Sequence, residues 1–294
     1  MLENLSTEKR NEKTASLDTL SVKEALHIMN NEDAKVTGAI ATNLTSIETV
    51  IKEVITSFKK GGRLIYVGAG TSGRLGVLDA AECVPTFGVP ATMVVGLIAG
   101  GEKAFLQAIE GAEDSVILGK EDLEGIALTA DDYVLGIAAS GRTPYVIGAL
   151  DYAKEVGAKT GALSCNTNAA ISSHADTAIE VDCGPEILTG STRLKAGTAQ
   201  KLVLNMISTV SMIGIGKVYK NLMVDVMPTN EKLVERSKRI IMEATECDYD
   251  TAANYYELAN QHVKTAIVMI LTKTDFATAT EKLADADGFI RRTL

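Results

Sequence analysis

An apolar run that breaks into a glycine-rich turn and then into a helical pattern is the feature that most constrains this chain. The run is Leu64–Val67, and the turn reads Gly68-Ala-Gly-Thr-Ser-Gly73. Such a turn places bare backbone N–H groups and a helix N-terminus at the edge of a sheet, where an anion binds well. The sequence therefore predicts a site for a phosphorylated small molecule, with Gly70, Thr71 and Ser72 as candidate ligands.

A second hydroxyl-rich turn, Ala139-Ser-Gly-Arg-Thr-Pro144, follows the apolar run Tyr133–Ala138. It opens a helical pattern over Thr143–Val156, in which Pro144 suits the first turn. A plain helix start explains this turn alone as well as phosphate binding does. Parallel sheets bind ligands beyond the carboxyl ends of their strands, where both turns are expected to lie, so phosphate binding is favoured. The candidate ligands here are Ser140, Gly141, Arg142 and Thr143.

A third stretch, Gly184–Lys201, is dense in hydroxyls and cations. Capping of a helix N-terminus explains part of this density. The excess over what capping needs predicts that Ser191, Thr192 or Lys195 contacts a ligand.

Strand-like and helical patterns alternate through the middle of the chain, which predicts an α/β fold with a doubly wound parallel sheet. Five strands are expected, at Leu64–Val67, Thr92–Val95, Tyr133–Ala138, Thr160–Ser164 and Ala178–Val181. Helical patterns precede the sheet from Ser21 to Lys60, close it over Lys195–Lys217, and fill the C-terminal part. Three parts are expected: an N-terminal helical segment over 1–55, a phosphate-binding core over 56–228 and a small helical appendage over 229–294.

In the C-terminal part, short polar residues mark the expected helix starts. Asn230 and Asp250 are expected to begin helices, and Asp275 is expected to cap the last one. The run Ala266–Leu271 is too short for its periodicity to separate strand from helix.

Composition excludes several classes of function. The chain has 294 residues, a net charge of −9 and no tryptophan, which argues against a nucleic-acid or anionic-membrane surface. The start, Met1–Arg10, is polar and lacks the apolar stretch of a secretory signal, so a cytoplasmic location is expected.

No cofactor or metal is expected. The four cysteines are scattered without a CxxC pair, the three histidines have no partner at metal-ligand spacing, and the cysteines are interpreted as buried free thiols. The turn at 68–73 formally matches a dinucleotide fingerprint, but the strand after it lacks the acid that binds a ribose.

Two glutamates follow the glycine-rich regions. Glu82 lies in an otherwise apolar stretch after the first turn, and Glu113 lies in Ile109–Ser115. A solvated face is the simpler interpretation of each. Paired carboxylates at a sugar site can, however, divide acid and base roles between them.

The core of the chain resembles the SIS (sugar isomerase) fold of phosphosugar-binding proteins. More narrowly, it resembles the N-acetylmuramic acid 6-phosphate etherases, bacterial cytoplasmic enzymes of cell-wall recycling, from about Leu17 to Arg292. The resemblance lies in Gly68–Gly88, Gly96–Ser115, Gly136–Tyr145, Gly184–Lys201 and Asn221–Asn230. The glucokinase regulatory protein, which binds phosphosugars without turning them over, shares the signature at Gly184–Lys201. One departure is Val84, where the family has proline.

The resemblance implies that Glu82 is the general acid and Glu113 the second acid/base residue of a carbon–oxygen lyase. This lyase cleaves the D-lactyl ether of its substrate without a metal or redox cofactor. The resemblance also implies a homodimer with the site near the subunit interface. An aldose–ketose isomerase and a non-catalytic phosphosugar sensor remain the alternatives. The candidates for the group that opens the sugar ring are His174, Glu186 and Lys195, and the sequence does not choose among them.

Overall fold

The structure is a computed structural model that describes residues 5–107, 109–226 and 231–294. It divides into two compact units. The first unit joins Met1–Ala80 to Thr92–Ser208, and the second joins Ala81–Ala91 to Thr209–Leu294. The expected division at residues 55 and 228 stays a prediction.

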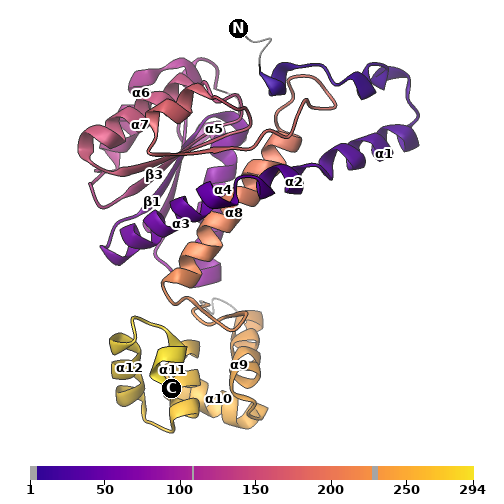
Figure 1. Ribbon diagram of the computed structural model, residues 1–294. Helices are drawn as coiled ribbons and strands as arrows, with labels where there is room; N and C mark the ends of the chain where they lie inside the picture. The colour runs from indigo at the N-terminus through magenta and orange to yellow at the C-terminus, as the bar shows by residue number, and fades with distance from the viewer. Residues whose placement is uncertain (1–4, 108, 227–230) are drawn as a thin grey trace. The chain divides into compact units, whose positions relative to one another are not determined.

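The first unit is built on a parallel five-stranded sheet in the order β2-β1-β3-β4-β5 (Figure 1). The strands are β1 (Leu64–Gly68), β2 (Val94–Ile98), β3 (Tyr133–Ala138), β4 (Lys159–Ser164) and β5 (Thr177–Glu180). All five expected strands are confirmed within three residues at each end. Strand order reverses next to β1, because the chain passes from β1 outward to β2 and then returns to β3 on the other side. Such a switch point is where doubly wound sheets bind ligands.

Helices cover both faces of the sheet. Ile65 and Val67 pack with residues of α7 (Pro144–Val156) and α6 (Val116–Gly125) in one buried core. Tyr66 points to the opposite face, where it meets Gly76 of α4 (Gly70–Phe87) at a spacing that leaves no room for a larger residue. The alternation along β1 is the period of two that places successive side chains on opposite faces.

The helical pattern from Ser21 to Lys60 becomes three helices: α1 (Val22–Asp33), α2 (Val36–Ala41) and α3 (Leu44–Lys59). A capping box between Ser21 and Glu24 begins α1, in agreement with the sequence. Short 3₁₀ turns at Ser6–Glu8, Glu12–Thr14 and Leu17–Thr19 precede it. We call residues 5–43 the N-terminal arm; Figure 1 shows α1 extending away from the sheet.

The N-terminal arm is fastened to the region after β4 and β5. The Ser6 hydroxyl donates to Asp182 at 2.7 Å, and the Asn166 amide donates to the Thr7 hydroxyl at 3.0 Å. These bonds join residues far apart in sequence, so the arm depends on the finished sheet for its position.

The second unit is mostly helical, with α9 (Glu231–Thr245), α10 (Tyr249–Leu258), α11 (Val263–Thr272) and α12 (Phe276–Asp285) around a core of their own. It also holds the two-stranded ribbon of β6 (Val218–Tyr219) and β7 (Leu222–Met223). Asp275 caps α12 as expected, whereas Asp248 rather than Asp250 caps α10. Ala266–Leu271 lies in α11. The predicted cap Asn230 lies outside the described residues.

The cysteines are free, as expected: Cys83, Cys165 and Cys183 are buried, and Cys247 is half-buried. Burial raises the pKa of the Cys183 thiol to about 11, so the thiol stays protonated and unreactive near neutral pH. Among the described residues, no helix is long and apolar enough to cross a membrane, and no group of His, Cys, Asp and Glu could hold a metal ion.

Candidate active site

The first predicted turn lies where β1 ends and α4 begins. A Cβ at Gly73 would lie 2.6 Å from the carbonyl oxygen of Gly68, so a side chain there would collide with the strand. Glycine therefore lets the first turn of α4 come directly against the end of β1. The N–H groups of that turn stay at the carboxyl edge of the sheet, as anion binding requires.

Beside this turn lies a pocket of about 170 Å³ that we call the Glu113 pocket. Its lining residues are Ala69, Gly70, Arg74, Ala99, Ala104, Gln107, Ile109, Glu110 and Glu113. The structure therefore brings the predicted Gly70 and the predicted Glu113 into one pocket. Its volume is below the 300–1,000 Å³ or so that small-molecule sites usually have.

Arg74 fixes one wall of the Glu113 pocket. Its guanidinium donates to the carbonyl oxygens of Ala104 at 2.8 Å, Phe105 at 2.9 Å and Gln107 at 3.2 Å. These carbonyls belong to the short helix α5 (Lys103–Leu106) and the residue after it. The arginine therefore joins the first turn of α4 to the loop that leads to Glu113.

The second predicted turn lines a separate pocket of about 330 Å³, which we call the Ser140 pocket. It is lined by Leu5, Ser140, Arg142, Thr167, Asn168, Ala169 and Ala170. Gly141 has a φ of +71°, and a Cβ there would lie 2.4 Å from that of Ala169. Thr143 is the N-cap residue of α7, but its hydroxyl makes no capping hydrogen bond. The turn thus leaves Ser140 and Arg142 on the wall of an open pocket.

Ser72 is turned toward the protein interior. Its side chain is 6% exposed, and its hydroxyl donates to Oε1 of Gln200 at 2.9 Å. Gln200 belongs to α8 (Lys195–Gly214), and Gly197 of the same helix lies beside Thr71. The N-terminal turns of α4 and α8 are therefore packed against each other.

The start of α8 is held by two buried acids. Both carboxylate oxygens of Glu186 accept backbone N–H groups, from Lys195 at 3.0 Å and Ala196 at 2.9 Å. The Lys195 ammonium donates to Glu32 at 2.9 Å and to the carbonyl of Cys183 at 2.9 Å. Lys195 is 1% exposed and Glu32 2%. These contacts give Lys195 a buried ion pair, not a surface that a phosphate can reach.

Burial raises the pKa of Glu32, but hydrogen bonds from Lys35 and Lys195 and the charges of both lysines outweigh it and lower the pKa to about 2. The carboxylate is therefore charged near neutral pH, where it forms an ion pair with Lys195. It joins the N-terminal arm to the start of α8.

Ser191 and Thr192 lie in the loop just before α8 and are half-buried. Their hydroxyls make no hydrogen bond within the described part of the chain, while the Thr192 carbonyl accepts the Gly197 N–H at 2.9 Å. The loop is thus fixed through its backbone and keeps two hydroxyls available. Neither residue lines the Glu113 pocket or the Ser140 pocket.

Glu82 lies on α4 and is exposed. It follows Ser72 by ten residues, which is about 15 Å along a helix. Of the two predicted catalytic glutamates, Glu82 belongs to the second compact unit and Glu113 to the first. Val84, the departure from the family's proline, continues the helix.

None of the three ring-opening candidates lines the Glu113 pocket. Glu186 caps α8 and Lys195 is paired with Glu32. His174 ends the 3₁₀ turn Ala170–His174, with Nδ1 lying 2.6 Å from Asp151 of α7. Each of these three residues therefore has a contact of its own away from the Glu113 pocket.

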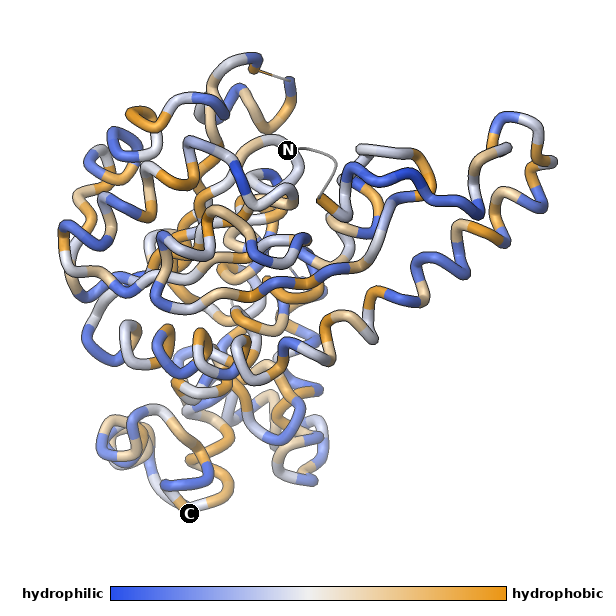
Figure 2. The backbone as a smooth tube through the Cα atoms, turned by 45° about the horizontal axis from the view of Figure 1, so that its top comes forward, coloured by the Kyte–Doolittle hydropathy of each residue, from blue (hydrophilic) through white to orange (hydrophobic). Residues whose placement is uncertain are grey.

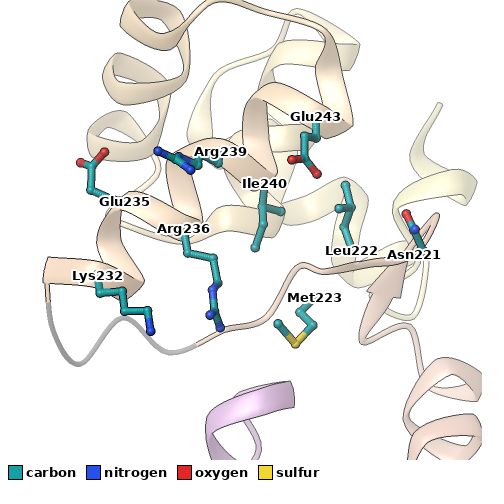
Figure 3. A pocket seen from close by; sticks show the side chains of 9 residues that line it. All are labelled: Asn221, Leu222, Met223, Lys232, Glu235, Arg236, Arg239, Ile240 and Glu243. Carbon is teal, nitrogen blue, oxygen red and sulfur yellow. The ribbon is translucent and has the colours of Figure 1, made fainter.

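A larger pocket, of about 500 Å³, lies in the second unit beside α9. Figure 3 shows Arg236 and Ile240 extending from α9 toward Met223. It contains none of the predicted site residues.

Sequence reasoning missed Gln200 and Gln107. Neither belongs to a residue type that marks a phosphate site, and only the packing of α8 on α4 brings Gln200 to Ser72. Arg74 directly follows the predicted turn Gly68–Gly73. Its hydrogen bonds to the carbonyls of α5 and Gln107 depend on the conformation of a loop, which no sequence pattern predicts.

The parallel sheet with hydroxyl-rich turns at its carboxyl edge is that of a SIS domain. A SIS domain model matches residues 107–210, and the model of the glucokinase regulatory protein N-terminal SIS domain matches residues 46–154. Among solved structures, a phosphoheptose isomerase from Neisseria gonorrhoeae superposes with a TM-score of 0.52 at 17% identity, over 65% of this chain and 98% of that one. This likeness shows the fold alone.

Relatives of known name are much closer in sequence. An N-acetylmuramic acid 6-phosphate etherase of Listeria monocytogenes is 73% identical over 294 residues, which is 100% of this chain and 99% of that protein. One from Enterococcus faecalis is 66% identical over 293 residues, with the same coverage. The chain therefore belongs to the N-acetylmuramic acid 6-phosphate etherase family.

Proposed function

We propose that this chain is a carbon–oxygen lyase that cleaves the D-lactyl ether of N-acetylmuramic acid 6-phosphate. The products are N-acetylglucosamine 6-phosphate and D-lactate, in amino-sugar recycling from the cell wall. The single observation that carries this proposal is the full-length identity of 73% to an etherase. The Glu113 pocket, which combines an acid with a helix N-terminus at the sheet edge, agrees with it.

The chemistry needs one base and one acid. In the open-chain aldehyde the C2 proton is acidic, and we assign its removal to Glu113. As the C2=C3 double bond forms, the C3–O bond breaks, and Glu82 in its neutral form protonates the departing lactate oxygen. Water then adds, with its hydroxyl at C3 and a proton at C2. No electron is gained or lost, so no redox cofactor takes part.

We assign phosphate binding to the two turns at the carboxyl edge. Gly70, Thr71 and Ser72 offer the N-terminus of α4, while Ser140, Gly141, Arg142 and Thr143 offer that of α7. Ser191 and Thr192 offer free hydroxyls before α8. Lys195 is buried in its ion pair with Glu32, so we assign the positive charge at the phosphate to Arg142, which lines the Ser140 pocket.

We propose further that the active protein is a homodimer whose site combines both copies. The Glu113 pocket, at about 170 Å³, is small for a sugar phosphate. The chain also exposes apolar side chains that a second copy could cover. On α1, Val22 is 79% exposed and Leu26 62%. Figure 2 shows hydrophobic residues recurring among hydrophilic ones along this helix.

Beside the Glu113 pocket, Leu106 of α5 is also an exposed apolar side chain that a second copy could cover.

We expect a cytoplasmic location from the family resemblance.

Incubation with N-acetylmuramic acid 6-phosphate in oxygen-18 water tests the reaction. Elimination followed by hydration labels the C3 hydroxyl of the sugar and leaves the lactate unlabelled. Label in the lactate would contradict the proposed route. Exchange of the C2 hydrogen without lactate release would indicate an isomerase, and binding without either change would indicate a sensor.

A further inference from the structure

The side chain of Gln200 ends in a buried amide, and the nitrogen of this amide, Nε2, has no hydrogen-bond partner among the described residues. The side chain is 0% exposed. Its Oε1 accepts the Ser72 hydroxyl at 2.9 Å. Buried polar groups are rarely left unpaired, so an amide donor with no partner needs an explanation.

The Ser72 hydroxyl has a single proton. In the described structure this proton points to Gln200 and not to the carboxyl edge of the sheet. A phosphate oxygen carries no proton to donate when it is a dianion, so a serine that binds it must donate. Ser72 therefore cannot serve Gln200 Oε1 and a phosphate together.

Rotation of the Gln200 amide by half a turn resolves this conflict. Nε2 then takes the place of Oε1 and donates to the Ser72 oxygen, since a hydroxyl accepts as well as donates. The contact between the two side chains is kept, and its direction is reversed. The Ser72 proton becomes free for the ligand.

We propose that Gln200 is a positioning residue for the phosphate, which turns its amide when a phosphorylated sugar binds and so releases the Ser72 proton. The proposal rests on the phosphate role proposed above for Ser72. It links the occupancy of the α4 N-terminus to a side chain on α8.

Substitutions separate this role from a structural one. Gln200→Glu can only accept, so it retains the Ser72 proton and places a negative charge beside the phosphate. Gln200→Met fills similar space without any hydrogen bond. Affinity for N-acetylglucosamine 6-phosphate, measured by calorimetry, is expected to fall about tenfold in Gln200→Met and by about a hundredfold in Gln200→Glu. Affinity for N-acetylglucosamine, which lacks the phosphate, stays unchanged.

The decisive comparison uses the Ser72→Ala background. Because Gln200 acts through the Ser72 hydroxyl, Gln200→Met should cause no further loss of affinity there. A tenfold loss in both backgrounds would overturn the proposal, and so would binding by Gln200→Met within twofold of the parent. Ser211→Ala is the matched control, because Ser211 is a buried residue on α8 whose hydroxyl has no described partner.

A measurement on the unaltered chain covers the case in which the Gln200 variants do not fold. The chain has three glutamines, Gln107, Gln200 and Gln261, so ¹⁵N-glutamine labelling gives three side-chain amide signals. Gln107→Asn and Gln261→Asn assign two signals and leave that of Gln200. N-Acetylglucosamine 6-phosphate is expected to shift the Gln200 signal, whereas N-acetylglucosamine is not. An unmoved Gln200 signal at saturation would overturn the proposal.

The experiments distinguish a failure of the proposed activity from a failure of this inference. Lactate release by the parent with an unmoved Gln200 signal would remove only the role of Gln200. A shifted signal without lactate release would remove the etherase activity and leave the phosphate response in place.

Discussion

The Lys195 ammonium lies 2.9 Å from the carboxylate of Glu32, and both side chains are buried although 163 residues separate them. Breaking such a pair by removing one partner leaves a buried charge without compensation. Glu32→Gln should therefore lower the free energy of unfolding at pH 7 by about 3 kcal/mol, in line with the lowered pKa of Glu32.

The pH dependence of this loss has a definite sign. The folded pKa of Glu32, about 2, is below its usual value of 4.5, so the stabilisation is complete above pH 4.5 and is lost as the pH falls from 4.5 to 2. Urea unfolding should show the parent and Glu32→Gln converging over that range. Glu48→Gln is the control, since Glu48 pairs with Lys52 on the exposed face of α3 and should matter little. A gap that stays constant with pH would refute the assignment.

Glu113→Gln should fold normally and lose lactate release by about 10²- to 10⁴-fold, the usual contribution of a general acid or base. Phosphosugar affinity should change little, because the amide keeps the shape of the Glu113 pocket. Circular dichroism and a coupled lactate assay check both points. Asp114→Asn, on the same short turn but outside the pocket lining, is the control. Near-normal turnover by Glu113→Gln would remove this residue from the mechanism.

Mixing two inactive variants tests whether the site combines two copies. Glu82→Gln and Glu113→Gln should each be inactive alone. If Glu82 of one copy serves Glu113 of the other, each mixed dimer contains one intact site. Equal mixing after mild unfolding and refolding should then restore about a quarter of the parental activity. Ultracentrifugation at the same concentration checks that the dimer forms. Absence of any recovery in a confirmed mixed dimer would place both glutamates in a single chain.

Ser140→Ala should weaken binding of the phosphorylated sugar about ten- to hundredfold, because a hydrogen bond to a charged phosphate is worth roughly 1.5–3 kcal/mol. Ser140 lines the Ser140 pocket and its neighbour Gly141 fixes the turn. Calorimetry with N-acetylglucosamine 6-phosphate measures the loss. Thr56→Ala removes an exposed hydroxyl on α3 that bonds only to its own helix, and should bind like the parent.

The sequence was sufficient for the sheet because each strand is a short apolar run bounded by polar or glycine-rich turns. The same logic placed Pro144 at the start of α7 and Asp275 before α12. It failed at Asp250, because Asp248 and Asp250 are both good caps, and it is the Asp248 side chain that accepts the Thr251 N–H.

For the candidate site, local pattern found the turns but not the direction of the side chains. Ser72 and Lys195 were both expected to face a ligand, and both are turned inward by partners distant in sequence, Gln200 and Glu32. Periodicity describes which face of a helix is apolar and carries no information about such pairings. The proposed pairing of Glu82 with Glu113 involves a second copy, and the pattern of one sequence does not describe contacts between copies.

The fastening of the N-terminal arm sets an order of events during synthesis. Residues 6 and 32 leave the ribosome first, yet their partners Asp182 and Lys195 come 176 and 163 residues later. At about 5–20 residues per second this delay is on the order of ten to thirty seconds. Throughout that time the arm has nowhere to dock, and the exposed Val22 and Leu26 of α1 are free to meet other chains. The N-terminal arm is thus synthesised first and reaches its final position last.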